Sequence, residues 1–339
     1  LASGQDAYPV RVPVTTTIPA VRDKYAHLVA EQESGDTVGI AGRVMFMRNT
    51  GKLCFAQLQA GTGETIQAML SFDRIGEEQL DAWKGLVDIG DVVAVVGEVI
   101  SSKRGELSVM TDSWHMAAKA LRPLPNPHKP LSEETRVRQR YADLIMRDTA
   151  RTVARLRPAT MSSLRASFAK RDYIEVETPM LQTMHGGAAA RPFVTASNAF
   201  DMQLFLRIAP ELFLKRCVVG GIERVFEINR NFRNEGADST HSPEFAMLEY
   251  YQAYADYNDM ATLTRELIQE AALAVHGTLN YELVDGGTRD LSGDWDQISV
   301  FPSVSKAIGK EITPETPIEE LRKLCADAGI THDPKAIHG

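Results

Sequence analysis

Alternating apolar and polar residues fill the first third of the chain, a pattern typical of strands with one buried face. Turn signals such as "NTGK" and "AGTGE" separate the runs. Five runs are predicted as strands: residues 37–48, 53–59, 65–70, 91–102 and 106–121. A helical pattern at 73–87 lies between the third and the fourth. This order favours an OB-fold, a barrel that binds oligonucleotides, although a generic small barrel has the same pattern.

A second region follows four prolines between Pro123 and Pro130, which predict a stiff, extended connector. Helices are expected at residues 132–145, 150–173 (with Pro158 inside), 204–219 and 258–275. Strands are expected at residues 174–181, 224–234 and 244–254. Helices and antiparallel strands therefore share this region, which predicts an α+β fold class.

Composition is ordinary for a soluble globular protein, with 44% hydrophobic and 24% charged residues among 339. Cys54, Cys217 and Cys325 lie far apart, so we expect no disulfide scaffold and a reducing, cytoplasmic compartment. No run approaches the roughly 18 apolar residues of a membrane span. The opening "LASGQDAYPV" lacks the basic and apolar regions of a signal peptide. We therefore expect no membrane partner.

The net charge of −8 argues against broad affinity for nucleic acid. Basic residues are nevertheless concentrated at 119–171, with 13 Lys and Arg against 4 Asp and Glu. Such a stripe is compatible with a local polyanion contact. A solvated helical face explains it equally well.

Two predicted strands flank the stretch "NFRNEGADSTHSPEFAMLEYY" at residues 231–251. Alternation places four polar residues on one face of the first strand: Glu227, Asn229, Asn231 and Arg233. On the second strand one face carries Phe245, Met247, Glu249 and Tyr251. If the strands pair, Arg233 lies near Phe245 and Glu249. A cation, an aromatic ring and a carboxylate suit a small ligand, whereas the alternative is the solvated face of a sheet.

The usual phosphate-binding signatures are missing from the chain. No G-x-x-x-x-G-K-[ST] occurs, and "GTGET" at 61–65 lacks the strand–helix context of a dinucleotide fingerprint. A nucleotide would therefore be held by side chains on an antiparallel sheet.

The stretch "FRNEGADSTHSPEFAMLE" resembles motif 2 of the class II aminoacyl-tRNA synthetases, and "YIEVETPML", with Pro179, resembles motif 1. The barrel then corresponds to the anticodon-binding OB domain of the subgroup for lysine, aspartate and asparagine. Within that subgroup "GGAAARPF" (186–193) and "LRIAPELFLKR" (206–216) resemble the lysine enzymes. Relatives for aspartate or asparagine typically carry glutamine where Glu211 stands.

The resemblance implies a domain order along the chain. It predicts an N-terminal extension (1–35), an OB-fold anticodon-binding domain (36–120), a Pro-rich linker (121–135) and a partial class II catalytic domain (136–339). The catalytic domain is expected to be built on an antiparallel β-sheet flanked by helices. Motif 1 builds a dimer in this family, so the resemblance also implies a homodimer.

The resemblance assigns ATP-binding roles to residues of motif 2. Arg233 matches the catalytic arginine that contacts the α-phosphate of ATP and the substrate carboxylate. Glu235 and His241 match loop positions near the adenine and the outer phosphates, and Phe245 matches the aromatic that stacks on adenine. Glu249 matches a residue that lies near the reactants and helps to bind Mg²⁺.

Other residues match the lysine site and the anticodon site. Gly187, Glu211, Glu249 and Tyr251 match positions that hold L-lysine, with Tyr251 near its ε-ammonium. In the barrel, Phe55 and Gln67 match residues that stack on and read the central anticodon uridine, and Arg48 is a weaker match. Taken alone, each residue has a simpler interpretation: Phe55 could pack inside the barrel, Phe245 could be core and His241 could be an ordinary loop residue.

The implied activity is ATP-dependent formation of lysyl-adenylate followed by transfer of lysine to the 3′ end of tRNA(Lys). Two alternatives stay open: a non-catalytic tRNA-binding or regulatory relative, and a lysyl transferase with another acceptor. The family's catalytic domain continues past position 339 with motif 3, which this chain lacks. We therefore expect the sequence to be incomplete, with the remaining lysine and Mg²⁺ ligands in the missing part.

Overall fold

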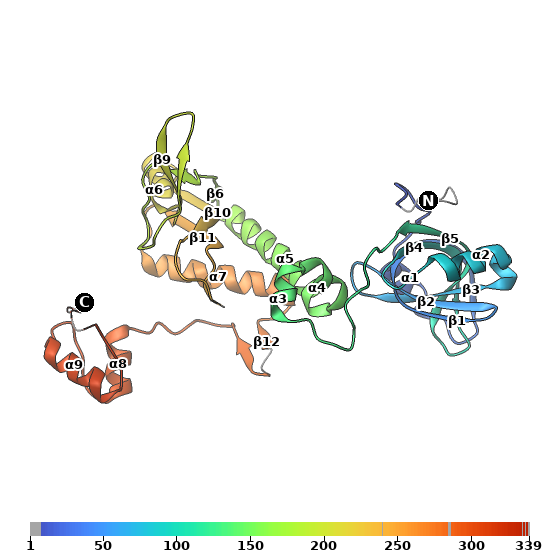
Figure 1. Cartoon of the computed structure of the whole chain (residues 1–339). Coiled ribbons are helices and arrows are strands. Elements are labelled where there is room, and N and C mark those ends of the chain that lie inside the picture. Colours follow the sequence, from blue (N-terminus) through green and yellow to red (C-terminus); the bar gives the residue numbers. More distant parts are fainter. Residues whose placement is uncertain (1–7, 239, 284–285, 334, 336, 338–339) are drawn as a thin grey trace. The chain divides into compact units, whose positions relative to one another are not determined.

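The computed structural model describes residues 8–238, 240–283, 286–333, 335 and 337. The chain forms two compact units, Leu1–Pro158 and Ala159–Gly339, hereafter the barrel unit and the sheet unit (Figure 1). Each is considered by itself. Of the predicted extension 1–35, the first seven residues lie outside the described residues.

The barrel unit contains the five predicted strands: β1 (Glu33–Thr50), β2 (Leu53–Gln59), β3 (Thr65–Ser71), β4 (Val92–Ser101) and β5 (Leu107–Ala118). They close into a barrel in the order β1-β2-β3-β5-β4. Only the β3–β5 pairing is parallel. The predicted order of strands and helix is confirmed, because the helical segment after β3 is α2 (Phe72–Leu86).

Two helices contribute to the core of the barrel. Ile18 of α1 (Ile18–Lys24) is buried in it, and Thr17 caps α1 by accepting a hydrogen bond from the backbone of Ala20. Trp83 of α2 is fully buried and meets Trp114 edge-on at 5.4 Å between ring centroids. Such T-shaped pairs add to the stabilisation from buried area. Helix α1 is therefore part of the packed barrel.

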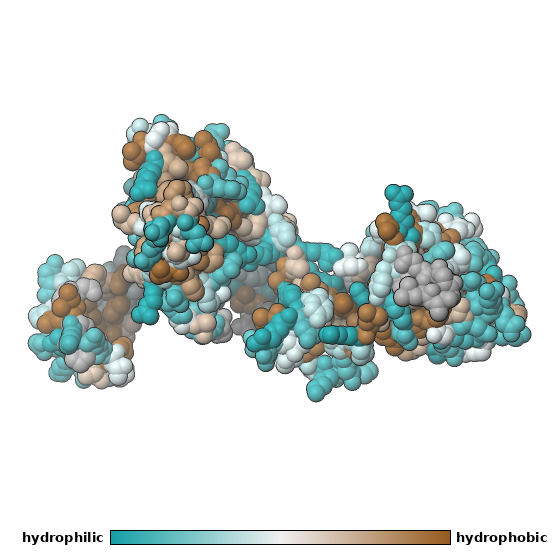
Figure 2. Space-filling view, turned by 45° about the horizontal axis from the view of Figure 1, so that its top comes forward, coloured by the Kyte–Doolittle hydropathy of each residue, from teal (hydrophilic) through white to brown (hydrophobic). Residues whose placement is uncertain are grey.

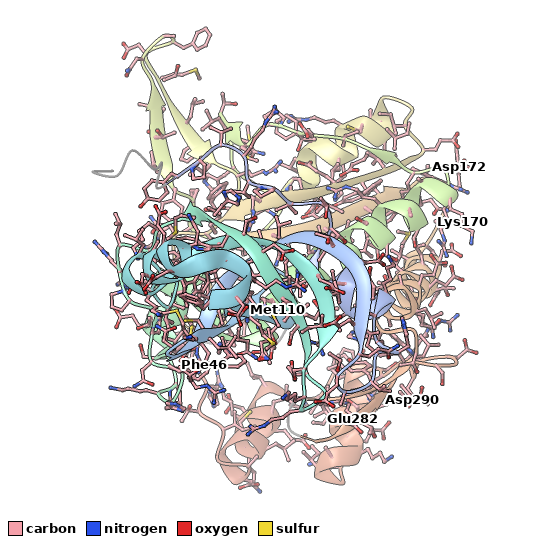
Figure 3. The ribbon with its side chains drawn as sticks, turned by 90° about the vertical axis from the view of Figure 1, so that its right-hand side faces the viewer. Phe46, Met110, Lys170, Asp172, Glu282 and Asp290 are labelled. Atoms are coloured by element: carbon pink, nitrogen blue, oxygen red, sulfur yellow. The ribbon has the colours of Figure 1, made fainter. Side chains whose placement is uncertain are left out.

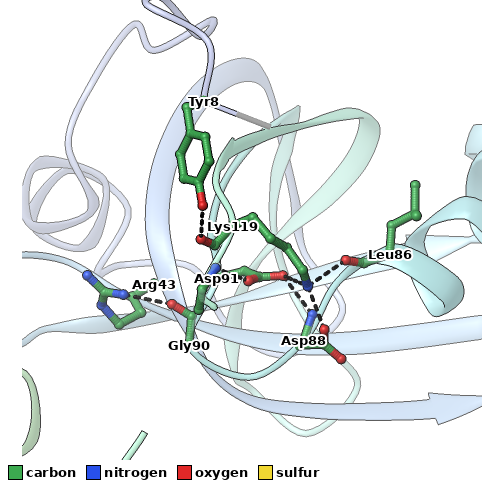
Figure 4. A network of polar contacts seen from close by, with 8 residues as sticks. Tyr8, Arg43, Leu86, Asp88, Gly90, Asp91 and Lys119 are labelled. Carbon is green, nitrogen blue, oxygen red and sulfur yellow. Dashed lines mark hydrogen bonds and ion pairs between the residues drawn. The ribbon is translucent and has the colours of Figure 1, made fainter. Parts of the chain in front are cut away.

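A buried carboxylate connects the start of β4 with the end of β5. Asp91 is fully buried and accepts hydrogen bonds from the Lys119 ammonium (2.8 Å), the Asp88 amide (2.8 Å) and the Ala120 amide (2.7 Å) (Figure 4). Lys119 also donates to the Leu86 carbonyl at 2.9 Å. These bonds satisfy a charge that would otherwise be costly to bury, and they fix the turn between α2 and β4.

The proline-rich segment is followed by two short helices, α3 (Glu133–Arg138) and α4 (Arg140–Met146), and by the longer α5 (Asp148–Lys170). The predicted helix at 132–145 is broken at Gln139, whose ψ of 57° is not helical. By contrast, α5 continues through Pro158. Pattern alone did not reveal the break, because the residues on both sides are good helix formers.

Most arginines of the basic stripe at 119–171 have acidic partners. Asp143, which is fully buried, accepts from both Arg140 (2.7 Å) and Arg147. The other pairs are Arg138–Glu134, Arg151–Asp148, Arg165–Glu175 and Arg171 with Glu266 and Glu270. Internal ion pairing therefore accounts for much of the stripe.

The sheet unit is built on β10 (Arg224–Phe232) and β11 (Glu244–Gln252), an antiparallel pair with β6 (Ile174–Glu175) parallel to β10. A smaller sheet has the order β7 (Leu181–Gln182), β9 (Met202–Leu206), β8 (Val194–Ser197). Two helices accompany them, α6 (Glu211–Val219) and α7 (Tyr257–His276). The α+β fold class is confirmed.

Two sequence predictions for the sheet unit were wrong in detail. The strand expected at 174–181 exists only at its two ends, as β6 and β7. The helix expected over 204–219 starts only at Glu211, since residues up to Leu206 belong to β9. A run as apolar as "LFLRIA" does not distinguish a strand from a buried helix.

One face of the β10–β11 sheet packs on helices. Phe168 of α5 stacks on Phe226 at 4.3 Å and lies 5.2 Å from Tyr250, between ring centroids. Leu263 and Leu267 of α7 join this cluster. Because side chains alternate along a strand, the opposite face of β10 and β11 is the one left for polar residues.

The chain beyond α7 forms small elements that the sequence patterns did not predict: a hairpin of β12 (Asn280–Glu282) and β13 (Thr288–Asp290), then α8 (Val300–Ile308) and α9 (Ile318–Asp327). This segment exposes apolar side chains, including Val300 and Phe301, within a surface of mixed hydropathy (Figure 2). Among the described residues, no helix has both the length and the apolar character needed to cross a membrane.

A buried ion pair connects the segments of the sheet unit. The side chains of Arg207 and Glu227 are 1% and 3% exposed and lie 2.7 Å apart. The Arg207 guanidinium also donates to the carbonyls of Thr178 (3.0 Å) and Arg230 (2.9 Å), and the Thr178 hydroxyl donates to Glu227 at 2.6 Å. The Arg207 amide bonds to Met180. One side chain thus joins the segment after β6, the end of β9 and β10.

Removing one partner of this pair should be strongly destabilising. Arg207→Met leaves the Glu227 carboxylate buried without its cation, so we expect the free energy of unfolding of the sheet unit to fall by about 3–5 kcal/mol. Differential scanning calorimetry can resolve the unfolding transitions of separate units. Applied to the natural full-length protein, it measures this change.

A matched control lies in the same strand pair. Glu244 and Arg230 form an exposed contact of 3.8 Å, so Glu244→Gln should cost less than about 1 kcal/mol. A loss for Arg207→Met no larger than the loss for Glu244→Gln would show that the buried pair does not hold the unit together.

Candidate functional site

The polar face of the β10–β11 pair has the composition that alternation predicted. Across the two strands Glu227 faces Glu249, Asn229 faces Met247 and Asn231 faces Phe245. Directly opposite residues of an antiparallel pair lie on the same side of the sheet. Residues of α5 and α7 pack on the other side, so these six side chains share one polar face of the sheet, of which Glu227, Asn229 and Asn231 are buried.

Arg233 and Phe245 are brought together at one end of this surface. The guanidinium carbon of Arg233 lies 5.0 Å from the centroid of the Phe245 ring, a cation–π geometry. The Arg233 amide donates to the Pro243 carbonyl at 2.9 Å, which fixes the strand end. The structure therefore places a cation and an aromatic face side by side, as expected from the sequence.

Carboxylates dominate the other end of the surface. Burial raises the pKa of Glu249 above its ordinary value, and the negative charges of Glu211 and Glu227 add to this effect. The Tyr251 hydroxyl opposes it by donating to Glu249 at 3.1 Å. Burial, together with Glu249, also raises the pKa of the Tyr251 phenol. Two further carboxylates and a neutral phenol thus lie around Glu249, a setting that favours a cationic ligand.

Gly187 lies directly against Glu211. Its φ of +88° is in the left-handed region that favours glycine. A Cβ at this position would sit 2.8 Å from the Cβ of Glu211, which is closer than real Cβ atoms approach. Glu211, the first residue of α6, also accepts from Lys215 at 2.6 Å. The backbone at Gly187 and the Glu211 carboxylate therefore belong to one site.

The loop residues Glu235 and His241 do not join this cluster in the described part of the chain. Glu235 accepts from the Arg191 amide at 3.3 Å. His241 is exposed, and its ring lies 3.0 Å from Asp238. Hydrogen bonds from the Thr240 amide, the His241 ring and the Thr240 hydroxyl lower the pKa of Asp238 to about 2. The predicted ATP roles of Glu235 and His241 stay predictions.

Sequence reasoning missed some residues of the site. Arg207 and Thr178, which hold Glu227, gave no signal because nothing in a local pattern marks a long-range buried pair. Asn229 was placed on the correct face, but its burial was not expected: both amide atoms are inaccessible and have no partner among the described residues. Asn231 donates to the sulfur of Met247 at 3.2 Å.

The residues that the structure describes do not form a magnesium site by themselves. Among the described residues, no group of three or more His, Cys, Asp or Glu side chains converges as metal ligands would. Magnesium takes nearly octahedral oxygen coordination through carboxylates, waters and phosphates, and Glu249 offers a single carboxylate whose raised pKa favours the proton. The residues present therefore do not fit Mg²⁺ by themselves.

The predicted anticodon residues lie together on the outside of the barrel. Cys54 and Ala56 are buried in the core, so Phe55 between them points outward, and the alternative of a core role for Phe55 is excluded. The Arg48 guanidinium lies 4.8 Å from the Phe55 ring centroid. Gln67, on the same face of β3, donates to the Ser108 hydroxyl at 3.3 Å.

Comparison with known families agrees with both units. The family model described as "tRNA synthetases class II (D, K and N)" matches residues 132–327. The model of the "OB-fold nucleic acid binding domain" matches residues 38–117. The first match covers more than half of the chain.

Individual relatives indicate which group within this family the chain resembles. A "Lysine--tRNA ligase" of Kineococcus radiotolerans is 62% identical over 98% of this chain and 67% of the relative. Another of Mycolicibacterium gilvum is 61% identical over 97% of this chain and 66% of the relative. A more distant relative, the "Lysylphosphatidylglycerol biosynthesis bifunctional protein LysX" of Rhodococcus jostii, is 43% identical and is matched over 29% of its length. The chain spans about two thirds of the length of the first two relatives. It therefore belongs to the class II lysine–tRNA ligases, in the synthetase family that also includes the aspartate and asparagine enzymes.

Proposed function

We propose that the sheet unit activates L-lysine with ATP and that the barrel unit binds the anticodon of tRNA(Lys), which receives the lysyl group at its 3′ end. One observation carries this proposal: Glu211 and Glu249 lie in one acidic cluster, on the same surface as the Arg233–Phe245 pair. An acidic pocket next to a cation on an aromatic ring suits an amino acid with two ammonium groups and one carboxylate.

The charges around Glu249 support lysine as the substrate. Glu227 is already neutralised by Arg207 at 2.7 Å, and among the described residues Glu211 has an ion pair with the exposed Lys215 alone. Glu249 has a hydrogen bond from Tyr251 and no cation within ion-pair distance among the described residues. Binding of an ammonium group would supply that missing positive charge and would stabilise the ionised carboxylate. A glutamine at position 211 would attract an ammonium group less strongly, because its side chain carries no negative charge.

The chemistry proposed for this surface is in-line attack at phosphorus. The lysine carboxylate attacks the α-phosphorus of ATP, lysyl-adenylate forms and pyrophosphate leaves. No bond to the enzyme is made, so catalysis depends on positioning and on stabilising negative charge. Arg233 would hold the α-phosphate and the substrate carboxylate, while the ring of Phe245 would support the adenine. In the second step the terminal hydroxyl of tRNA attacks the carbonyl carbon of lysyl-adenylate, so that an ester with lysine forms, the bond to the phosphate breaks and AMP leaves.

Further parts of the proposal go beyond the family assignment. Mg²⁺ would be held with ATP phosphates and with ligands additional to Glu249, and when bound it would neutralise phosphate charge. A homodimer through motif 1, which comprises α5 and β6, follows from the family resemblance. A reducing, cytoplasmic setting is supported by Cys54, Cys217 and Cys325, which are all free thiols.

An alternative acceptor is a second candidate because of the similarity to the LysX relative. A lysyl-lipid product would require the same adenylate and a different acceptor. The charging of tRNA carrying a lysine anticodon, measured beside lysyl transfer to phosphatidylglycerol, distinguishes the two. Transfer to lipid without tRNA charging would overturn our proposal for the acceptor.

Removal of the Arg233 side chain should strongly slow adenylate formation. Because the guanidinium stabilises charge at the α-phosphate, we expect Arg233→Ala in the full-length protein to slow lysine-dependent ATP–pyrophosphate exchange by about 10²–10³-fold. Exchange that stayed within a few-fold of the unsubstituted enzyme would contradict the role given to Arg233.

Removal of the Phe55 side chain should impair the proposed tRNA binding by the barrel unit and leave the proposed lysine activation by the sheet unit intact. Phe55→Ala should leave ATP–pyrophosphate exchange unchanged and weaken tRNA(Lys) binding by the ~1–3 kcal/mol typical of a stacked base. Charging assays at varied tRNA concentration measure this. A loss of exchange equal to that of Arg233→Ala would show that the division of labour is wrong.

The raised pKa of Glu249 predicts that lysine binds more weakly at low pH. Above about pH 4.5, the ordinary pKa of glutamate, the free protein still keeps part of Glu249 protonated, and the proton must leave for the carboxylate to attract an ammonium group. The affinity for lysine should therefore rise with pH through the raised pKa and level off above it. Isothermal titration calorimetry from pH 5 to 8 measures this dependence.

The control for this dependence is a variant that cannot titrate at this position. Glu249→Gln should bind lysine more weakly and with a flatter pH profile, whereas Glu244→Gln, on the opposite face of β11, should keep the original profile. An unchanged slope in Glu249→Gln would assign the pH dependence to another group.

A further inference from the structure

Strand β1 changes the direction of its side chains in the middle of the barrel wall. Ile40 and Val44 point into the core and are fully buried, so simple alternation would also send Phe46 inward. The register shifts between Val44, which faces Leu58, and Phe46, which faces Gln57. Between these two pairs β1 advances by two residues while β2 advances by one. This irregularity is a β-bulge.

The bulge turns Phe46 to the outside. Its side chain is 55% exposed, whereas the next residue, Met47, packs against the core (Figure 3). Bulges commonly re-aim a side chain beside a functional site. More than half of the Phe46 side chain is accessible to solvent and is therefore available for a contact on the outer surface.

The surroundings of Phe46 are those of the proposed anticodon surface. Opposite it in the sheet lies Gln57, and opposite Gln57 on β3 lies Gln67. Arg48 is two residues along the same strand, and Arg48 faces Phe55 across the strands. Phe46 and Phe55 are thus diagonal neighbours on one face, a spacing of about 7–8 Å between such positions.

The two phenylalanines differ in what covers them. One face of the Phe55 ring is occupied by the guanidinium of Arg48 at 4.8 Å. Phe46 makes no ring–ring or cation–π contact with any residue that the structure describes. Its ring is therefore open for stacking, and the amides of Gln57 and Gln67 beside it can reach the hydrogen-bonding edge of a base.

We propose that Phe46 is a second stacking platform of the barrel and binds a base of single-stranded RNA adjacent to the base that stacks on Phe55. The inference rests on the proposed function of the barrel as the anticodon-binding unit. Successive unpaired bases stacked on successive aromatic rings are the usual way in which such surfaces bind RNA. The neighbouring cation, Arg48, and the two glutamine amides favour an RNA base over an apolar protein segment as the occupant.

The test measures RNA binding by the natural full-length protein, with a fluorescently labelled anticodon stem-loop of tRNA(Lys) as the probe. By fluorescence anisotropy we expect Phe46→Ala to raise the Kd by at least about fivefold, the lower end of the range for one stacked base. Phe46→Tyr, which keeps the ring, should stay within about twofold. Lysine-dependent ATP–pyrophosphate exchange and the thermal unfolding of the barrel should not change, because the side chain is exposed.

The controls separate this inference from the proposed function. Val29→Ala removes another apolar side chain from the same unit, 69% exposed, and should leave the Kd unchanged. Weaker binding in Phe55→Ala with normal binding in Phe46→Ala would overturn the inference alone. Normal binding in both variants would overturn the anticodon role of this surface as well. A Phe46→Tyr variant as weak as Phe46→Ala, or a fall in the unfolding temperature, would also overturn the stacking role.

Discussion

The buried pair of Arg207 and Glu227 is the interaction on which the geometry of the sheet unit depends. Its members are almost completely excluded from solvent, and every hydrogen bond that Arg207 makes goes to a different segment of the unit or to its partner. A charge buried in this way is tolerated only if its partner and its hydrogen bonds are in place. The pair therefore specifies one arrangement of β9, β10 and the segment after β6.

This arrangement has a direct consequence for the proposed lysine site. Arg207 lies four residues before Glu211, and Glu227 faces Glu249 across the strands. Arg207 compensates the negative charge of Glu227 locally. Glu249 is therefore the carboxylate whose protonation is expected to change when a ligand binds. The charge of the same guanidinium lowers the pKa of Glu249 and so moderates the repulsion between the carboxylates there.

Patterns of alternation predicted the strands and their faces well, because burial on one side of a sheet imposes a period of two on the sequence. The placement of Arg233 beside Phe245 followed from that rule, whereas the position of Phe55 was left open by the pattern and was suggested by the family resemblance alone. The rule fails where the backbone itself departs from regularity. The bulge that exposes Phe46 and the break of the helix at Gln139 leave no mark in the period.

Long-range pairs set a second limit on sequence reasoning. Arg207 reaches Glu227 and Thr178, which lie 20 and 29 residues away, and no spacing rule connects them. The roles of individual side chains came from family resemblance rather than from pattern. The family itself is shown by similarity over nearly the whole chain.

The central claim is that the acidic cluster around Glu249 selects lysine. ATP–pyrophosphate exchange by the natural full-length protein, measured with each amino acid in turn, tests it most directly. The account predicts strong exchange with L-lysine and only background exchange with aspartate, asparagine and uncharged amino acids. Exchange driven by aspartate or asparagine, or no lysine-dependent exchange at all, would contradict it.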